Sequence, residues 1–169
     1  MESRRVRIGL LGCGNVGAAF VGLVADQAKA IEARTGVALE ITRVAVRNLS
    51  KQRDVRLDPA LLTRHADEVV ADPDIDLVVE LIGGIEPARE LITTALAAGK
   101  PVVTGNKELL ANVGVELYGI AEDHGVDLLF EASVAGGIPI VRALRESLRG
   151  EPITRVMGIV NGTTNYILT

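Results

Sequence analysis

The most constraining feature of the sequence is a set of glycines near its start. In "VRIGLLGCGNVGAAF" (residues 6–20), an apolar run leads into Gly12, Gly14 and Gly17, which are spaced G-x-G-x-x-G, and a helical pattern follows. In a turn between a strand and a helix, Gly12 permits the tight turn and Gly14 lets a phosphate approach the backbone. Gly17 lets the helix pack close to the strand. The stretch therefore indicates a phosphate-binding strand–turn–helix unit, the alternative being a glycine-rich turn without a ligand.

Apolar strand patterns alternate with helical patterns along the whole chain. Strands are expected at residues 6–12, 38–46, 75–84, 101–106, 126–132 and 153–162. Helices are expected at residues 16–36, from Asp58-Pro59 onwards, and at 87–99, 107–125 and 139–149. This order specifies a parallel sheet with right-handed crossovers and helices on both faces. We therefore predict an α/β fold, a Rossmann-type doubly wound parallel sheet.

The end of the second predicted strand carries basic residues where a dinucleotide-binding unit usually has an acid. That acid would hold the ribose 2′-hydroxyl of NAD. Here the strand ends "VAVRNLSK", so Arg47 occupies that place and Lys51 follows. Because a guanidinium attracts a 2′-phosphate that a carboxylate would repel, we predict NADP(H) in preference to NAD(H). The alternative is that both are solvated loop charges.

The composition excludes several classes of protein. The net charge of −4 and the 2% of aromatic residues argue against a nucleic-acid partner. No apolar run approaches the ~18 residues of a membrane span. The only cysteine, Cys13, lies between two glycines without a visible base, so we interpret it as a small packing residue and not as a nucleophile. Together these features favour a cytoplasmic protein without a membrane partner.

A single lysine stands where a ligand is expected. Lys107 follows the predicted strand 101–106 and precedes a helix. In open α/β sheets, ligands bind beyond the carboxyl ends of the strands. Because a cation is unfavourable at a helix N-terminus, Lys107 requires a reason to be there. It is a candidate catalytic residue, which either holds the cofactor or polarises a substrate carbonyl; a solvent-facing lysine is the alternative.

Several motifs together resemble one family. They are "GLLGCGNVG", "VVELIGG", "VVTGNKELLA", "FEASVAGGIPIVRALRESL" and "GIVNGTTNYILT". In order and spacing they are similar to homoserine dehydrogenase, along nearly the whole chain. The resemblance implies reversible hydride transfer between NADP(H) and the pair L-aspartate 4-semialdehyde and L-homoserine. This reaction belongs to threonine, methionine and isoleucine biosynthesis.

The resemblance also implies roles for individual residues. Cofactor-binding positions are Gly12, Gly14, Asn15, Val16, Gly17, Arg47, Lys51, Gly83 and Lys107. Glu131, Val134, Gly136 and Ile138 match a monovalent-cation site, generally sodium. Gly162 and Thr163 match a segment near the amino-acid substrate. From the residues alone, "EASVAGGIP" is as well explained as a loop entering a helix.

The resemblance divides the chain into two parts. Residues 1–130 would form the dinucleotide-binding domain, and residues 131–169 the incomplete start of an α+β substrate, catalytic and dimerisation domain. The family's catalytic aspartate and second lysine have no counterpart here. We therefore expect this chain to bind the cofactor with little or no turnover, and the full-length enzyme to be a homodimer.

Two other functions stay open at this stage. A non-catalytic NAD(P)-sensing module would share the glycine turn but would not need "EASVAGGIP" or "NGTTN". Another Rossmann oxidoreductase, acting on a sugar or small aldehyde, is the second alternative. Sugar dehydrogenases usually carry E-K-P where this chain has "GNK". An acylating semialdehyde dehydrogenase needs a cysteine nucleophile in its catalytic region, whereas the only cysteine here is Cys13.

Overall fold

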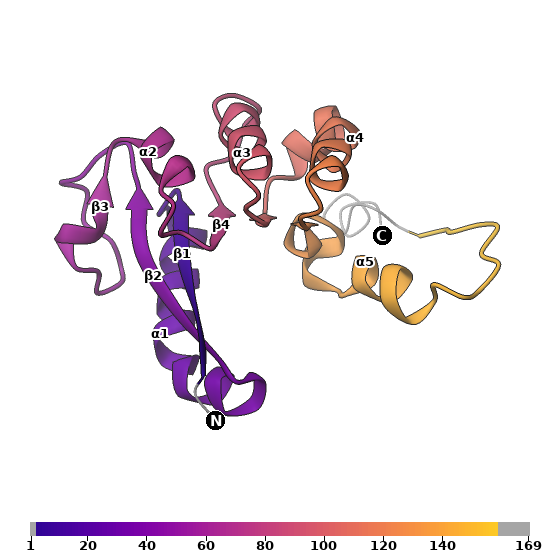
Figure 1. Cartoon of the computed structure of the whole chain (residues 1–169), viewed down its shortest axis with the longest axis horizontal. Coiled ribbons are helices and arrows are strands. Elements are labelled where there is room, and N and C mark those ends of the chain that lie inside the picture. The colour runs from indigo at the N-terminus through magenta and orange to yellow at the C-terminus, as the bar shows by residue number, and fades with distance from the viewer. Residues whose placement is uncertain (1–2, 159–169) are drawn as a thin grey trace, which may run out of the picture. The chain divides into compact units, whose positions relative to one another are not determined.

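The computed structural model of the chain describes residues 3–158. The chain forms two units, and strands and helices alternate in the first, Met1–Leu129 (Figure 1). The strands are β1 (Arg4–Leu11), β2 (Val37–Ala45), β3 (Leu62–Thr63), β4 (Leu77–Glu80), β5 (Val102–Thr104) and β6 (Leu128–Leu129). The helices are α1 (Asn15–Thr35), the 3-10 turn η1 (Pro59–Leu61), α2 (Ala66–Ala71), α3 (Ala88–Ala97) and α4 (Lys107–Asp123).

The six strands form one parallel sheet in the order β3-β2-β1-β4-β5-β6. The chain moves outward from β1 to β3 and then returns to β4 on the other side of β1. Right-handed crossovers that run in opposite directions place their helices on opposite faces, so the sheet is doubly wound. The predicted fold class is therefore confirmed for this unit. The reversal between β1 and β4 creates a crevice at the carboxyl ends of the strands.

The core lies on both faces of the sheet. Buried strand residues include Ile8, Leu10, Leu11, Val44, Val78, Val79, Val102 and Leu128. Helices contribute Val21, Val24, Ile92, Leu96, Leu109 and Leu117, and α1 packs along β2 (Figure 1). Complete burial of one such leucine stabilises the fold by about 1.5–3 kcal/mol. Continuous apolar strands are therefore explained by a sheet that is covered on both sides.

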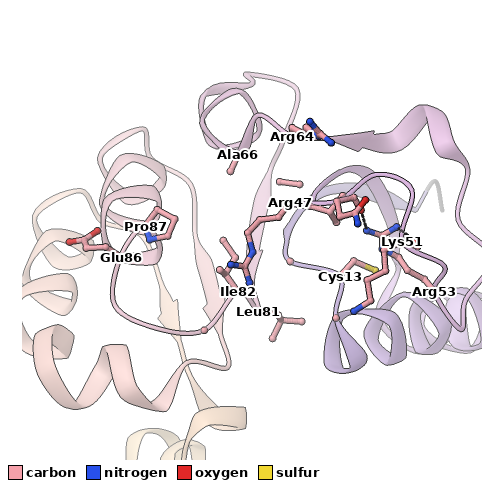
Figure 2. A pocket seen from close by; sticks show the side chains of 16 residues that line it. Cys13, Arg47, Lys51, Arg53, Arg64, Ala66, Leu81, Ile82, Glu86 and Pro87 are labelled. Carbon is pink, nitrogen blue, oxygen red and sulfur yellow. Dashed lines mark hydrogen bonds between the residues drawn. The ribbon is translucent and has the colours of Figure 1, made fainter.

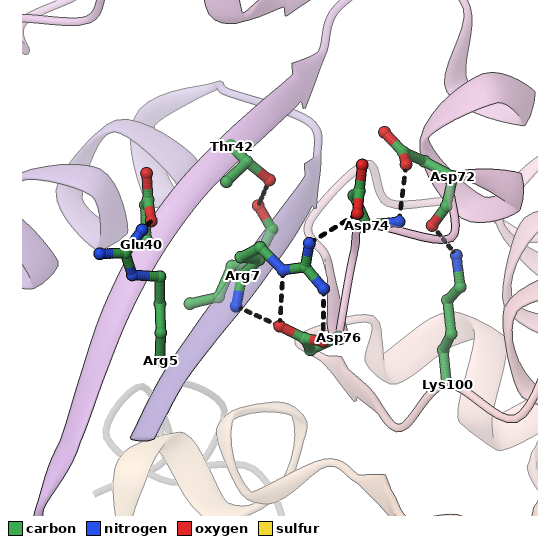
Figure 3. Close-up of polar contacts among 9 residues, drawn as sticks. Arg5, Arg7, Glu40, Thr42, Asp72, Asp74, Asp76 and Lys100 are labelled. Atoms are coloured by element: carbon green, nitrogen blue, oxygen red, sulfur yellow. Dashed lines mark hydrogen bonds and ion pairs between the residues drawn. The ribbon is translucent and has the colours of Figure 1, made fainter. Parts of the chain in front are cut away.

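Ion pairs hold the sheet near the amino-terminal ends of its strands, opposite the crevice (Figure 3). Arg7 on β1 contacts Asp76 through Nε at 3.1 Å and Asp74 through Nη1 at 2.7 Å. These carboxylates, Asp76 first, raise the pKa of the Arg7 guanidinium, and hydrogen bonds from Arg7 lower the pKa of Asp76. Nearby, the ammonium of Lys100 donates to the carbonyl of Asp72, while burial lowers the pKa of Lys100. This end of the sheet is therefore a structural region of satisfied charges.

The second unit, Phe130–Thr169, contains short helical turns in the residues that the structure describes. They are η2 (Glu131–Ser133), η3 (Ala135–Gly137), α5 (Ile140–Arg142) and the π-helical turn η4 (Ala143–Ser147). Both carboxylate oxygens of Glu131 accept backbone N–H groups, from Val141 at 2.9 Å and Arg142 at 2.8 Å. Glu131 thereby supports the start of α5. No helix within residues 3–158 is both long enough and apolar enough to cross a membrane.

Several predicted elements differ from those observed. The strand expected at 75–84 ends at Glu80, because Gly83 and Gly84 adopt positive φ and turn the chain. Asp58-Pro59 starts only the three-residue turn η1, and the helix expected at 139–149 is split into α5 and η4. The strand expected at 126–132 is reduced to Leu128–Leu129. Two-residue β3 has too little pattern to be predicted.

The last predicted strand is wrong over the part that can be compared. Residues 153–158 have no regular secondary structure, and residues 159–162 lie outside the described part of the chain. A strand needs a neighbouring strand to pair its backbone N–H and C=O groups. None forms within residues 130–158. Sequence pattern alone reports the apolar character of this stretch, not the presence of a partner.

Candidate dinucleotide-binding site

A cleft of about 540 Å³ opens in the first unit where β1, β2 and β4 end (Figure 2). It is lined by Gly12, Cys13, Gly14, Ala45, Val46, Arg47, Asn48, Lys51, Arg53, Arg64, Ala66, Leu81, Ile82, Gly83, Glu86 and Pro87. Cys13, Lys51 and Arg53 lie on one side of it, and Glu86 and Pro87 on the other (Figure 2). The cleft coincides with the reversal of strand order, where open α/β sheets bind their ligands.

The three glycines of the turn are required for different reasons. Gly12 has a φ of 94°, and a Cβ there would lie 2.7 Å from the carbonyl oxygen of Leu81. A Cβ on Gly17 would lie 2.3 Å from the carbonyl oxygen of Gly12. A Cβ on Gly14 would meet no heavy atom within 4 Å. Gly12 and Gly17 therefore serve the fold, whereas the space at Gly14 is open for a ligand.

The start of α1 is left open toward the cleft. Gly14 is its N-cap, no side chain caps the first turn, and that turn contains no acidic residue. The first intrahelical bond runs from Ala18 N to Gly14 O at 2.8 Å. The N–H groups that precede Ala18 therefore have no partner within the helix. Together with the helix dipole they favour an anion at this position.

The loop after β2 brings positive charge to the cleft. Arg47 and Lys51 are both exposed and line it together with the glycine turn. Arg47 extends toward Ile82 across the cleft (Figure 2). Within residues 3–158, neither cation forms an ion pair. Unpaired cations beside an open helix N-terminus suit a polyphosphate ligand.

Arg53 fastens this loop and was not singled out from the sequence. Its Nη1 donates to Lys51 O at 2.8 Å and its Nη2 to Asn48 O at 2.7 Å. Its Nε is buried without a hydrogen-bond partner among the described residues. The basic residues from Arg47 to Arg56 could have indicated that Arg53 lies in the same loop as Arg47 and Lys51. Its contacts with backbone carbonyls could not have been predicted, because they depend on the loop's conformation.

Cys13 is a packing residue in this site. Its side chain is buried, and burial raises the pKa of its thiol, an effect that the neighbouring Arg53 opposes. A thiol with a raised pKa carries little thiolate near neutral pH, and it is the thiolate that acts as a nucleophile. The geometry therefore agrees with the interpretation of Cys13 as a small residue packed beneath the turn.

The other predicted cofactor residues fall into separate places. Gly83 lines the cleft, whereas Val16, Gly17 and Lys107 are outside its lining. Asn15 lines an adjacent cleft of about 580 Å³ that runs beside α1 and also includes Lys51. Lys107 is the exposed first residue of α4. Its position follows β5, and so it lies at the carboxyl edge of the sheet.

Two further residues near this edge were missed by sequence reasoning. Arg64 lines the cleft directly after β3, and no ion pair involves it in the described part of the chain. Glu80, the last residue of β4, is completely buried. β3 is too short to be recognised, and the sequence shows Glu80 only as an acid inside an apolar run. Tertiary structure is needed to see what either residue contacts.

The residues predicted for a cation and for the substrate belong to the second unit. Glu131 lies on η2, Gly136 lies on η3 with a φ of 61°, and Val134 and Ile138 flank η3. No cluster of three or more His, Cys, Asp or Glu side chains suited to a metal occurs in the described residues. A cation site made mainly of backbone carbonyls contains no such cluster of side chains, so this finding does not test it. Gly162 and Thr163 lie outside the described residues.

The glycine turn, the open start of α1 and the cations after β2 define a dinucleotide-binding domain on a doubly wound sheet. Family models agree: residues 12–131 match "Homoserine dehydrogenase, NAD binding domain", and residues 139–169 match "Homoserine dehydrogenase". The chain belongs to the homoserine dehydrogenase family.

Individual relatives give the same result. The homoserine dehydrogenase of Bacillus subtilis is 46% identical over 166 residues, which are 98% of this chain and 38% of that protein. The Corynebacterium glutamicum enzyme is 50% identical, over 96% of this chain and 36% of its own length. The chain thus spans well under half of these relatives.

Solved structures confirm the fold. A homoserine dehydrogenase from Thiobacillus denitrificans superposes with a TM-score of 0.87 and 46% identity, covering 99% of this chain and 39% of its own. A hyperthermophilic archaeal homoserine dehydrogenase in complex with NADPH has a TM-score of 0.70 and 26% identity. It covers 86% of this chain and 50% of its own.

Proposed function

We propose that this chain is the cofactor-binding part of a homoserine dehydrogenase that uses NADP(H) in preference to NAD(H). The observation that carries the preference is the pair Arg47 and Lys51 beside the glycine turn, with no carboxylate at the end of β2. The 2′-phosphate would contact these cations, and the pyrophosphate would lie at the open start of α1. The NADPH complex of the archaeal relative is consistent with this assignment.

The reaction we assign to the intact enzyme interconverts L-aspartate 4-semialdehyde and L-homoserine, a step of threonine, methionine and isoleucine biosynthesis. When bound, the reduced nicotinamide supplies the hydride that reaches the aldehyde carbon. Lys107 lies at the edge of the sheet beyond β5, where its ammonium would polarise the aldehyde oxygen or hold the cofactor. Gly162 and Thr163 are the proposed contacts to the amino-acid part of the substrate.

A monovalent cation, sodium, is proposed for the segment that includes Glu131, Val134, Gly136 and Ile138. The donors there are oxygens on irregular backbone with a single carboxylate, which suits a hard cation of low charge. The carboxylate of Glu131 is already engaged with the backbone of α5, so carbonyl oxygens would supply most of the ligands. We further propose a homodimer and a cytoplasmic location for the full-length enzyme, with residues 131–169 as the start of its substrate domain.

Cofactor titration tests the proposed preference. We expect Arg47→Ala to weaken NADP⁺ binding by about 10- to 100-fold, because a charge-assisted contact contributes about 1.5–3 kcal/mol. NAD⁺ binding should change less than about twofold, since NAD⁺ has no 2′-phosphate. Arg47→Lys keeps the charge and should lose less, and Arg5→Ala, a surface cation paired with Glu40, is the matched control. Equal or tighter binding of NAD⁺ by the unmodified chain would contradict the preference.

A further inference from the structure

A completely buried carboxylate lies beside the cleft and takes no part in the functions described above. Glu80 is 0% exposed, although an unsatisfied buried charge is very costly. Its Oε1 accepts N–H groups from Ile82 at 2.7 Å and Gly83 at 3.2 Å. Its Oε2 accepts the hydroxyl of Thr104 at 2.5 Å. All three partners donate to the carboxylate, so Glu80 ties the loop after β4 to the end of β5.

The connection continues to the start of α4. Thr104 Oγ1 accepts the backbone N–H of Asn106 at 3.0 Å. The side-chain Nδ2 of Asn106 donates to Gly84 O at 2.6 Å, and its Oδ1 accepts the N–H of Leu109 at 3.1 Å as the N-cap of α4. Lys107 is the first residue of that helix. One buried network therefore holds both the loop 81–84 and the turn that carries Lys107.

The loop needs such support because its own backbone does not define one conformation. Gly83 and Gly84 both have positive φ, 81° and 75°, and glycine populates many other states. Leu81, Ile82 and Gly83 nevertheless form one wall of the cleft. Leu81 is held by its N–H to Leu11 O at 2.8 Å, and Ile82 and Gly83 are held by their hydrogen bonds to Glu80.

The orientation of the cofactor decides which half this wall contacts. A dinucleotide lies across the crevice, with one half over β1–β3 and the other over β4–β6. If the cations after β2 hold the 2′-phosphate as proposed, the adenosine lies on the first half. The nicotinamide half is then left for the region after β4 and β5, where the Glu80 network lies.

We propose that Glu80 is a positioning residue for the nicotinamide half of the cofactor and for Lys107. It acts through Thr104, Asn106 and the loop 81–84, and contacts neither cofactor nor substrate itself. This inference rests on the proposed cofactor binding. In this role, Glu80, Thr104 and Asn106 affect the binding of the nicotinamide half of the cofactor but not that of the adenosine half.

The test compares two ligands that differ at the nicotinamide end. NADPH contains both halves, whereas 2′,5′-ADP retains the 2′-phosphate but lacks nicotinamide. We expect Glu80→Gln to weaken NADPH binding roughly five- to tenfold in calorimetry and 2′,5′-ADP binding less than about twofold. The amide of glutamine cannot accept from all three donors, so the loop loses part of its support. Bound NADPH should also show nicotinamide fluorescence closer to that of the free cofactor.

A second pair of variants covers the case in which Glu80→Gln does not fold. Thr104→Val removes the hydroxyl at nearly constant volume, and Thr104→Ser retains it. Thr104→Val should reproduce the selective loss of NADPH binding. Thr104→Ser should bind NADPH as the unmodified chain does. The inference would be overturned if the variants lost affinity for NADPH and 2′,5′-ADP equally, or if neither Glu80→Gln nor Thr104→Val lost affinity for NADPH. The proposed function would still stand in both cases. If the unmodified chain bound neither ligand, the proposed function would fall and this inference with it.

Discussion

Two helices begin at the same edge of the sheet, and their first turns are built in opposite ways. α1 begins at Gly14 without a side-chain cap, and Gly14 lines the cleft. α4 begins after Asn106, whose side chain accepts the N–H of Leu109. A free helix start is a binding site for an anion, whereas a capped one is already satisfied. The difference indicates which of two similar strand–helix turns holds the phosphates and which holds a side chain in place.

The largest expected effect concerns the packing beneath the open helix start. Gly17→Ala would place a Cβ 2.3 Å from the carbonyl oxygen of Gly12, and backbone on both sides leaves little room to adjust. We expect a loss of stability of about 3 kcal/mol or more, measured by urea unfolding. Gly22→Ala in the same helix is the control, because its Cβ would meet only Val55 Cγ2 at 3.9 Å. It should stabilise the chain by roughly 0.5–1 kcal/mol. Similar results for both variants would contradict close packing at Gly17.

The next effect converts the open start of α1 into a capped one. Gly14 has an extended backbone, with φ −81°, and space around its Cβ, so Gly14→Asp fits and its carboxylate would accept the free N–H groups. We expect unchanged or slightly higher stability, by about a few tenths of a kcal/mol. NADP⁺ binding should weaken by roughly 100-fold, because the carboxylate occupies the anion site and repels phosphate.

Gly14→Ala is the matched control for that change, since it adds a Cβ without charge or capping oxygen. It should weaken NADP⁺ binding less than Gly14→Asp does in parallel calorimetric titrations. Retained NADP⁺ affinity in Gly14→Asp would show that the start of α1 is not the phosphate site.

The smallest effect separates the two roles of Asn106 at the capped helix start. Asn106→Ala removes both the cap and the bond to Gly84, and we expect it to lower the free energy of unfolding by about 1–2 kcal/mol. Asn106→Ser keeps an oxygen that can accept the N–H of Leu109, but its side chain is too short to donate to Gly84. Its stability should lie closer to that of the unmodified chain, while its NADPH affinity falls. Equal unfolding free energies for the two variants would show that the cap contributes nothing measurable.

The sequence predicted the parts of the molecule that depend on local pattern. The strand–helix order, the glycine turn and the C-terminal end of α1 at Gly36 follow from spacing and from residues that tolerate positive φ. Arg47 and Lys51 were found because a known position in this kind of unit was basic instead of acidic. Their meeting with the glycine turn in one cleft follows from the parallel sheet, whose strand ends share an edge.

The rest depends on contacts between residues far apart in the chain. Glu80 and Thr104 are 24 positions apart, and nothing in either segment shows that they share a hydrogen bond. Arg53 acts on backbone carbonyls, which have no sequence signature. The apolar stretch at 153–158 was wrongly predicted as a strand because pairing needs a partner that pattern does not reveal.

The two hydrogen bonds of the Asn106 side chain also have a consequence for local opening. Because one amide group both caps α4 and holds the carbonyl of Gly84, rotation of that side chain breaks the helix cap and a loop contact in one event. We therefore expect the first turn of α4 and the loop 81–84 to open together, since the Asn106–Gly84 bond and the Glu80–Thr104 bond both connect them across 22 and 24 positions of the chain. In hydrogen-exchange terms, the amides of Ile82, Gly83 and Leu109 should become exposed together and share one protection factor.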